Sequence, residues 1–507
     1  MNFIWPENFR FVGKSCPEGR EVPGRIIAGR SALIAELLKA QGVLPGDRVA
    51  MWLTEGENQV AAMFGCWAAG ATFCVLPSFA GRSNTERSQL RVDDVWSVLQ
   101  PKLLLKGAGA ELPDVLAGTV DVLELPALDA EVDETSDPDA LIAGRGPDDM
   151  AFIQFTSGST GGAKGAVVRF GQLMANLNAI AERTELTSAD CMVSWAPLYH
   201  DMGLMAVLLP LSRGADIVLM ETDHFVRRPT AWLETISRFG GTISTAPPTA
   251  LKLLSRRKAQ NIDLSSWRYA WIGGEMVFPT ILKGFEDTYA DAGLAQGVLQ
   301  PTYGMAETVV GISCGIPGEP WSEQNGFISC GPPLPDMELQ IVDEAGSPVA
   351  TGTQGQIMVR GPSVMQGYLG LDSFAPEAWF DTGDLGFETA GRIYITGRTK
   401  DVLKRGAESF PATVVEAIAE DALGLRTGRA AAFASQRPDI GKEEIVLLVE
   451  SRDWGDEQVR SVAAAVTKEL GLQVDVIRNV KGGRLPRTSS GKLMRQKAAA
   501  LYREGLV

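Results

Sequence analysis

Short apolar runs alternate with amphipathic stretches over most of the chain. Runs at residues 48–53, 215–220, 241–246 and 267–272 predict buried strands, and the stretches at 32–40, 204–209, 230–239, 249–256 and 279–292 predict helices. Strands that are separated by helices indicate parallel sheets with helices on their faces. We therefore expect an α/β fold for the larger, N-terminal part of the chain.

The pattern changes toward the C-terminus. Alternating residues on both sides of a Glu344-Ala345-Gly346 turn predict antiparallel hairpins at 337–360. A last part contains expected helices at 413–422 and 456–470, with strands at 430–434 and 444–450 between them. We expect a large domain, residues 1–400, of layered and mostly parallel sheets with a small antiparallel β subdomain. A small α+β domain, residues 401–507, follows.

An uncharged run covers residues 60–80. It has the length of a membrane span, but two glycines and the pair Pro77-Ser78 interrupt it. A buried helix at 59–69 that ends at Gly70, followed by a buried strand at 72–76, accounts for the run better. We expect no membrane span.

Composition narrows the class of protein. A length of 507 residues exceeds one ordinary core, so several domains are expected. The net charge of −15 argues against a nucleic-acid partner. The six cysteines have neither CxxC pairing nor metal-binding spacing, which indicates reduced thiols and a cytoplasmic protein.

One segment carries the strongest chemical signal, the string Phe-Thr-Ser-Gly-Ser-Thr-Gly-Gly-Ala-Lys-Gly from Phe155 to Gly165. Its glycines let backbone N–H groups turn toward an anion, and the hydroxyls and Lys164 complete a cradle for a polyphosphate. A plain Gly/Ser surface linker would need neither the lysine nor apolar strands on both sides. The standard P-loop ends in Gly-Lys-Ser/Thr, whereas Ala163 and Gly165 flank this lysine, which argues against a P-loop kinase or ATPase.

Three more segments contain candidate site residues. The string Pro-Leu-Tyr-His-Asp-Met-Gly-Leu contains His200, one of the two histidines of the chain. The segments Gly273-Gly274-Glu275 and Thr302-Tyr303-Gly304-Met305-Ala306-Glu307 each follow an expected strand, where open α/β sheets bind ligands. Tyr303 offers a flat face to an adenine ring, and Glu307 offers an oxygen ligand to Mg²⁺. The simpler interpretations are a structural histidine, a plain turn and a solvated carboxylate.

Three C-terminal strings complete the set: Phe380-Asp381-Thr382-Gly383-Asp384, Gly397-Arg398-Thr399-Lys400-Asp401 and Pro486-Arg487-Thr488-Ser489-Ser490-Gly491-Lys492. Alone, each could be a solvated turn. Taken in order with the segments above, they resemble the motifs of the acyl-adenylate-forming superfamily over essentially the whole chain. That group includes acyl-CoA ligases, fatty acyl-AMP ligases, peptide-synthetase adenylation domains and beetle luciferases.

The resemblance implies a reaction and its cofactors. ATP, with Mg²⁺ on Glu307, would activate a small carboxylic acid as acyl-AMP, and the acyl group would pass to a thiol. The thiol would be that of coenzyme A or of the phosphopantetheine on a carrier protein. Catalytic roles are implied for Lys492, His200 and Glu307, and a hinge at Lys400 would let the lid of residues 401–507 move. Nucleotide binding is implied for Thr156, Ser157, Gly158, Ser159, Thr160, Lys164, Gly274, Glu275, Thr302, Tyr303, Gly304, Asp384 and Arg398.

Two features leave alternatives open. Ala306 stands where most members of the superfamily have threonine, so one phosphate donor is missing, as in a non-catalytic acyl-binding relative; the fatty acyl-AMP ligase branch often has alanine there too. The string His-Asp-Met-Gly-Leu favours that branch, which loads carrier proteins. The compact stretch 361–384 leaves no room for that branch's insertion and favours coenzyme A, which we prefer. A fatty or bulky hydrophobic acid is expected as the substrate.

Overall fold

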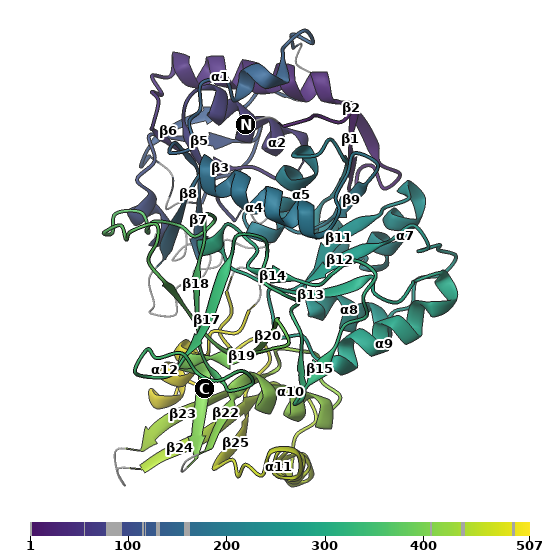
Figure 1. Ribbon diagram of the computed structural model, residues 1–507, viewed down its shortest axis with the longest axis vertical. Helices are drawn as coiled ribbons and strands as arrows, with labels where there is room; N and C mark the ends of the chain where they lie inside the picture. Colours follow the sequence, from purple (N-terminus) through teal and green to yellow (C-terminus); the bar gives the residue numbers. More distant parts are fainter. Residues whose placement is uncertain are drawn as a thin grey trace. The chain divides into compact units, whose positions relative to one another are not determined.

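The computed structural model describes residues 3–54, 56–77, 94–113, 116, 118–127, 132–156, 163–405, 408–437, 442–488 and 492–507. The chain divides into two compact units (Figure 1). The first consists of Met1–Leu339, Val359–Phe380 and Ala390–Tyr394, and the second of Gln340–Met358, Asp381–Thr389 and Ile395–Val507. The expected domain boundary at residue 400 stays a prediction.

The first unit contains an eight-stranded sheet. Its order is β14 (Ser313–Cys314), β13 (Leu299–Tyr303), β12 (Tyr269–Ile272), β11 (Ile243–Ala246), β9 (Cys191–Ser194), β10 (Asp216–Met220), β1 (Asn8–Val12) and β2 (Arg20–Pro23). All inner pairings are parallel, and only the two edge strands β14 and β2 pair antiparallel. The carboxyl ends of the inner strands therefore share one edge of the sheet, where ligands bind in such folds.

A six-stranded sheet is the second layer of this unit. Its order is β6 (Asp121–Glu124), β5 (Leu103–Lys106), β3 (Arg48–Trp52), β4 (Thr72–Val75), β7 (Met150–Thr156) and β8 (Lys164–Arg169). Only β7 and β8 pair antiparallel. The expected layered, mostly parallel architecture is thus confirmed.

Helices pack their apolar faces against the sheets. They are α1 (Gly24–Ala40), α2 (Glu57–Ala68), α4 (Phe170–Arg183), α5 (Asp201–Leu211), α6 (Thr222–Arg227), α7 (Thr230–Phe239), α8 (Pro248–Arg256) and α9 (Pro279–Tyr289). One core cluster joins Trp232 of α7, Leu251 of α8 and Phe285 of α9 to Val193 and Ile272 of the eight-stranded sheet. Burial of this apolar surface is the main force that holds α7, α8 and α9 against the sheet.

The described part of the uncharged run, residues 60–77, is mostly buried in the core. Helix α2 is buried on nearly all sides, and β4 is buried along its whole length, as the sequence predicted. Among the described residues, no helix is long and apolar enough to cross a membrane.

The second unit has a three-stranded sheet of β23 (Ala430–Arg437), β24 (Lys442–Val449) and β25 (Val476–Asn479). Alternate residues of β23 and β24 point to opposite faces. One set packs with α10 (Ala412–Ala422) and α11 (Asp456–Leu470), and the other set packs with α12 (Arg495–Arg503). A hairpin of β21 (Val402–Arg405) and β22 (Glu408–Pro411) precedes α10. The expected small α+β fold is confirmed.

Two smaller sheets complete the described structure. A four-stranded sheet has the order β17 (Glu338–Val342), β18 (Gly355–Arg360), β19 (Phe380–Thr389) and β20 (Arg392–Arg398). Strands β17 and β18 lie within the region 337–360 that was expected to form hairpins. Strands β15 (Glu323–Gln324) and β16 (Phe327–Ile328) form a separate antiparallel pair.

Candidate active site

The glycine-rich segment is flanked by two paired strands. Strand β7 ends at Thr156 and β8 begins at Lys164, and these two residues are direct partners in the antiparallel register. The expected strands on both sides of the segment are therefore confirmed. Ser157, Gly158, Ser159 and Thr160 lie outside the described residues.

Lys164, Tyr368 and Glu307 come together from three separate segments. The Lys164 ammonium lies 5.1 Å from the centroid of the Tyr368 ring, within range of a cation–π interaction. The Tyr368 hydroxyl donates a hydrogen bond of 2.8 Å to Oε1 of Glu307. The lysine of the glycine-rich segment and the carboxylate of the Tyr-Gly-x-x-Glu motif thus belong to one cluster.

The backbone around Tyr368 explains its position. Tyr368 forms an antiparallel bridge with Ala166 on β8, and the N–H of Leu369 donates to the carbonyl of Gly165 at 2.8 Å. The N–H of Met365 donates to the carbonyl of Glu307, also at 2.8 Å. This stretch therefore lies between the edge of β8 and the Glu307 turn, and it holds both in place.

Ala306 has a packing role at the position where the superfamily usually has threonine. It is buried in an apolar cluster with Ala166 and Met365, beside Tyr368 and Phe374. A hydroxyl at this position would need a partner in apolar surroundings, which makes a small apolar side chain the better fit. The departure from the usual motif is thus accommodated by the local core.

The turn that carries Glu307 is conformationally strained. Glu307 lies in a single 3₁₀ turn, Ala306–Thr308, and the next residue, Val309, has φ 69° and ψ −65°. The N–H of Val310 donates to the carbonyl of Thr308 at 2.9 Å, which closes a three-residue turn around Val309. This conformation is rare for a β-branched residue. Strain of this kind is concentrated at functional sites.

The two expected nucleotide segments of the large sheet are neighbours. Strands β12 and β13 pair in parallel with Ile272 opposite Pro301, so the residues that follow them meet at one edge. A Cβ on Gly273 would lie 2.6 Å from Oγ1 of Thr302, and one on Gly304 would lie 1.7 Å from the Val310 carbonyl oxygen. Both positions therefore require glycine. Gly274, which has φ +79°, is exposed at the same edge, and Glu275 follows it half-buried.

Tyr303 is buried to a greater degree than an open adenine platform would be. It is only 8% exposed, at the end of β13, and its neighbour Thr302 is half-buried. At most an edge or a small part of the ring is therefore available to a ligand. Its role in nucleotide binding stays a prediction.

His200, in the middle of the histidine motif, is the residue directly before helix α5. Its N–H donates to the Pro197 carbonyl at 3.0 Å, and its ring lies 4.8 Å from that of Tyr199. The side-chain amide of Gln154 on β7 donates to the Tyr199 carbonyl, which ties this motif to the strand that enters the glycine-rich segment. Gly203 packs against Pro197 so closely that a Cβ would lie 2.1 Å from its carbonyl oxygen.

In the second unit, Asp384 and Arg398 form an ion pair. Nε of Arg398 lies 3.0 Å from Oδ1 of Asp384, and their side chains are 58% and 7% exposed, respectively. The N–H of Asp384 donates to Oγ1 of Thr382, which in turn donates to the carbonyl of Ile357 at 2.9 Å. The structure thus pairs two of the residues for which nucleotide binding was expected, with the carboxylate fixed and the guanidinium exposed.

Lys400 and Lys492 are both exposed residues of the second unit. Lys400 lies in a 3₁₀ turn, Thr399–Asp401, and its carbonyl accepts a hydrogen bond of 3.1 Å from the side chain of Gln496. The Lys492 N–H donates to Oγ1 of Thr488 at 2.9 Å, and the Thr488 N–H donates to the Lys492 carbonyl at 2.7 Å. The catalytic and hinge roles of these lysines stay predictions.

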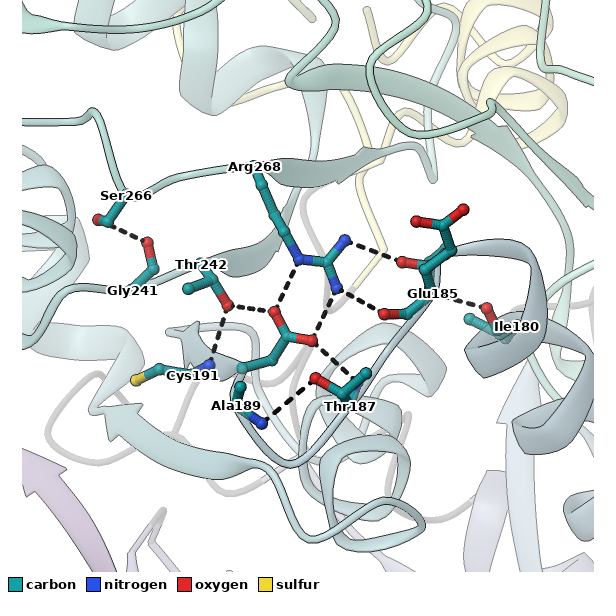
Figure 2. Close-up of polar contacts among 11 residues, drawn as sticks. Ile180, Glu185, Thr187, Ala189, Cys191, Gly241, Thr242, Ser266 and Arg268 are labelled. Atoms are coloured by element: carbon teal, nitrogen blue, oxygen red, sulfur yellow. Dashed lines mark hydrogen bonds and ion pairs between the residues drawn. The ribbon is translucent and has the colours of Figure 1, made fainter.

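A buried ion pair fixes the opposite ends of the inner strands. Arg268 binds both carboxylate oxygens of Asp190 at 2.7 Å, and Thr242 Oγ1 donates to Asp190 at 2.7 Å. Figure 2 shows the Arg268 guanidinium also reaching backbone carbonyls near Glu185. These residues stand just before β9, β11 and β12. They support the sheet at the edge remote from the motif residues.

Tyr368 is the site residue that motif analysis missed. It lies in a stretch without helical or strand periodicity, so only the Gly367-Tyr368 pair, an aromatic residue after a glycine, could have marked it. Its partners are distant in sequence, and the contact with Glu307 spans 61 residues. Contacts of this kind follow from the tertiary fold and not from local pattern.

The residues around Glu307 fit a magnesium ion that is shared with phosphates. Mg²⁺ commonly uses one or two carboxylates together with substrate phosphate oxygens. No cluster of three or more potential metal-ligating His, Cys, Asp or Glu side chains occurs among the described residues, so a site made by the protein alone is not indicated there. Tyr368 engages one oxygen of Glu307, and a carboxylate has further lone pairs for a cation.

Comparison with known proteins identifies relatives over nearly the whole length. A protein of Caulobacter vibrioides named "Putative acyl-CoA synthetase" is 32% identical, over 96% of this chain and 91% of its own. A medium-chain-fatty-acid–[acyl-carrier-protein] ligase of Moorena producens is 29% identical, over 94% of this chain and 88% of its own. A solved structure from work on fatty acyl-adenylate ligases of E. coli and L. pneumophila has a TM-score of 0.86 and 28% identity, and the match covers 99% of this chain and 96% of that one.

The sequence motifs, the fold and these relatives agree. The AMP-binding enzyme model matches residues 21–369, which include the glycine-rich segment, His200, the Gly273–Glu275 turn, Glu307 and Tyr368. The chain belongs to the AMP-binding enzyme family.

Proposed function

We propose that this protein activates a carboxylic acid with ATP. The acid's carboxylate oxygen would attack the α-phosphorus, the bond to the bridging oxygen would break, and acyl-AMP and pyrophosphate would form. The observation that carries this proposal is the cluster of Lys164, Tyr368 and Glu307. It places a cation at the end of the glycine-rich segment over the ring of Tyr368, and a carboxylate on the hydroxyl of the same tyrosine, which suits a magnesium–polyphosphate complex.

Each part of the site has a proposed task in this reaction. Lys164 and the hydroxyl residues of the glycine-rich segment hold phosphates, and the edge formed by Gly274 and Thr302 faces the adenine with Tyr303. Asp384 accepts hydrogen bonds from the ribose hydroxyls, and Arg398 lies beside it. Mg²⁺ bound at Glu307 would neutralise charge on the phosphates.

Lys492 and His200 are the proposed residues nearest the reacting carboxylate. The ammonium of Lys492 would offset negative charge that builds up on a five-coordinate phosphorus. Lys492 is exposed, which leaves its ammonium available to a ligand. His200 lies at the start of α5, next to the strand that enters the glycine-rich segment.

The second half-reaction is proposed to transfer the acyl group to a thiol. The thiol sulfur would attack the acyl carbon, and AMP would leave. We propose residues 1–400 as the main domain and 401–507 as a lid that turns about Lys400 between the two half-reactions. We favour coenzyme A as the acceptor because the stretch 361–384 is compact. A carrier protein is the alternative, favoured by the His-Asp-Met-Gly-Leu string and by the acyl-carrier-protein ligase among the relatives.

The site of action is proposed to be the cytoplasm. All six cysteines are unpaired, and five of them are buried, as expected of a protein that folds where thiols stay reduced.

Product analysis tests the proposed function. The purified protein is incubated with ATP, Mg²⁺ and one of dodecanoic, benzoic or 4-hydroxyphenylpropanoic acid. The expected products with at least one acid are AMP and pyrophosphate, and acyl-AMP when no thiol is supplied. Formation of ADP would contradict the proposal, and so would absence of turnover with all of a wider panel of acids. Coenzyme A and a phosphopantetheine-loaded carrier protein are then compared as acceptors.

A further inference from the structure

An ion cluster in the second unit is not explained by the roles above. It consists of Asp401, Glu416 and Arg495, which we call the Arg495 cluster. Nη1 of Arg495 donates to Asp401 at 2.8 Å, while Nε and Nη2 donate to the two oxygens of Glu416 at 2.7 and 2.6 Å. The exposed fractions of the three side chains are only 15% for Arg495, 16% for Asp401 and 9% for Glu416.

The Arg495 cluster joins the two segments for which functional lysines are proposed. Asp401 directly follows Lys400, and Arg495 begins α12 only a few residues after Lys492. The next residue, Gln496, donates from its side chain to the Lys400 carbonyl at 3.1 Å. Two neighbouring residues at the start of α12 therefore both bind the turn that contains Lys400.

The third member of the cluster is fixed to the core of the unit. Glu416 lies on α10, and its Oε1 also accepts a hydrogen bond of 2.9 Å from the N–H of Ala432 on β23. Burial raises the pKa of Glu416, whereas the positive charge and hydrogen bonds of Arg495 act in the opposite direction. The guanidinium is thus held on a carboxylate that the sheet itself positions.

The segment that contains Lys492 has its two ends joined to each other next to this cluster. Arg487 bridges to Leu493, and the N–H of Met494 donates to the Pro486 carbonyl at 2.9 Å. These contacts involve the residues directly before α12. The start of α12 therefore determines where the segment that contains Lys492 is anchored. A guanidinium bound in a bidentate way has a defined plane and direction, which a flexible ammonium does not provide.

We propose that Arg495 is a positioning residue for the first half-reaction. Its contacts with Asp401 and Glu416 anchor the end of the segment that contains Lys492. They therefore determine the position of Lys492 relative to Lys400. The inference rests on the proposed function, because it assumes that Lys492 acts during adenylation. In the proposed function, Lys492 takes no part in the transfer of the acyl group from acyl-AMP to a thiol. That transfer should therefore not depend on the contacts of Arg495.

The variant Asp401→Asn tests this role with little change of shape. It removes the charge at one arm of the cluster and leaves the bidentate pair of Arg495 and Glu416 in place. We expect the rate of AMP and pyrophosphate release, with the best acid of the panel, to fall about tenfold, the usual effect of weakening one charge-assisted hydrogen bond. Thioester formation from the synthetic adenylate of that acid and the preferred thiol should stay within about twofold, a range below the effect of one lost hydrogen bond.

Arg495→Lys is the second variant, because lysine keeps the positive charge but cannot make the planar bidentate contact of a guanidinium with Glu416. It should show the same selective loss, to a larger degree. Tyr502→Phe is the control: Tyr502 lies near the other end of α12, and its hydroxyl donates to Glu444 of the same unit at 3.1 Å. That control should change both half-reactions equally or not at all, and circular dichroism and thermal unfolding monitor the folding of all three variants.

The outcomes separate the inference from the proposed function. Equal slowing of both half-reactions in Asp401→Asn would show a merely structural cluster and would overturn the inference, as would an unchanged adenylation rate. If the wild-type protein releases no AMP with any acid, the proposed function itself fails and the inference falls with it. Selective loss of adenylation in Asp401→Asn, with transfer intact, supports the positioning role.

Discussion

The hydroxyl of Tyr368 donates a 2.8 Å hydrogen bond to Oε1 of Glu307. Burial raises the pKa of this phenol, and the negative charge of Glu307 raises it further, so Tyr368 remains protonated and continues to donate. The bond turns one carboxylate oxygen toward the tyrosine and so fixes the plane of the carboxylate. Because the ring also contacts Lys164, a single side chain positions both the proposed metal ligand and the proposed phosphate ligand.

Tyr368→Phe tests the contribution of the hydroxyl group separately from that of the aromatic ring. The variant keeps the ring beneath Lys164 but loses the hydrogen bond to a charged group, which typically costs about 1.5–3 kcal/mol. We expect kcat/KM for adenylation to fall at least about tenfold, a change that corresponds to 1.4 kcal/mol, and the Mg²⁺ concentration for half-maximal rate to rise. A pyrophosphate-release assay with varied Mg²⁺ measures both.

Tyr289→Phe is the control for this experiment. Tyr289 is fully buried in the first unit, and its hydroxyl donates to the Leu254 carbonyl at 3.1 Å. Its loss should lower the thermal unfolding temperature and leave the Mg²⁺ dependence unchanged. The role given to Tyr368 would be wrong if both tyrosine variants altered the Mg²⁺ dependence to the same extent.

Glu307→Gln tests the carboxylate itself. An amide oxygen is a weaker ligand for Mg²⁺ than a carboxylate oxygen, so adenylation should need more Mg²⁺ and should stop in the presence of EDTA. The amide also accepts from Tyr368, which keeps the local structure. Wild-type activity that survives EDTA would remove the basis for a metal role, and an unchanged Mg²⁺ requirement in the variant would move that role away from Glu307.

Lys492→Ala removes the charge proposed to stabilise the reacting centre. Loss of one oriented donor of this kind usually costs about 10²–10³ in rate, and we expect pyrophosphate release to fall by that factor. Lys492 is exposed, so the thermal unfolding temperature should hardly change. Transfer from synthetic acyl-AMP to the thiol serves as the internal control and should persist. Equal pyrophosphate release by wild type and variant would exclude the role.

Much of the fold could be predicted from local pattern. Helices α7 and α11 have the bounds that were expected, because each has an apolar face of regular period and ends at a glycine, Gly240 or Gly471, in the left-handed region. Strands β1 and β2 and helix α4 were not predicted. Strand β1 finds its partner, β10, some two hundred residues away, so no local signal marks the pairing.

The site was predictable as separate motifs and not as an assembly. The sequence placed the segments of Gly274 and of Thr302 to Glu307 at the ends of strands, and the parallel pairing of β12 and β13 brings Gly274 and Thr302 together. The contacts of Tyr368, Arg268 and Arg495 depend on partners far along the chain, and these follow from tertiary packing. The periodicity of apolar residues predicts which face of a helix or strand is buried. It does not predict which polar groups from distant segments come into contact.

Lys400→Pro tests the proposed hinge. Proline fixes φ near about −65° and restricts the residue before it, so the turn at Thr399–Asp401 would keep one conformation. We expect adenylation to persist and thioester formation from synthetic acyl-AMP to be lost. Lys400→Ala is the control, since it removes the side chain without restricting the backbone. Thioester formation by the proline variant at the wild-type rate would place the movement elsewhere.

The ion pair of Asp190 and Arg268 predicts an acid-sensitive contribution to stability. Burial would raise the pKa of Asp190, but hydrogen bonds from Arg268, Thr187 and Thr242 outweigh it and hold the pKa below its ordinary value. A carboxyl whose pKa is lowered on folding stabilises the protein above the unfolded pKa of about 3.9, and this contribution disappears as the pH falls through the folded value. Acidification below about pH 4 should therefore remove it.

Arg268→Leu and Asp190→Asn should reveal this contribution in different ways. Arg268→Leu leaves a carboxylate that is 5% exposed without its cation, and we expect a loss of roughly 3 kcal/mol at pH 7, the lower end for buried pairs because Arg268 is 32% exposed. Asp190→Asn should flatten the dependence of the unfolding temperature on pH below about pH 4.

The exposed pair of Arg360 and Glu338 provides the comparison for these variants. Its side chains are 33% and 58% exposed, so Arg360→Leu should change stability much less than Arg268→Leu does. Thermal unfolding from pH 7 to pH 3 measures all three variants. If Arg268→Leu is as mild as Arg360→Leu, or if Asp190→Asn loses stability in acid as steeply as the wild type, the Asp190 carboxylate does not stabilise the strand ends in the way the geometry indicates.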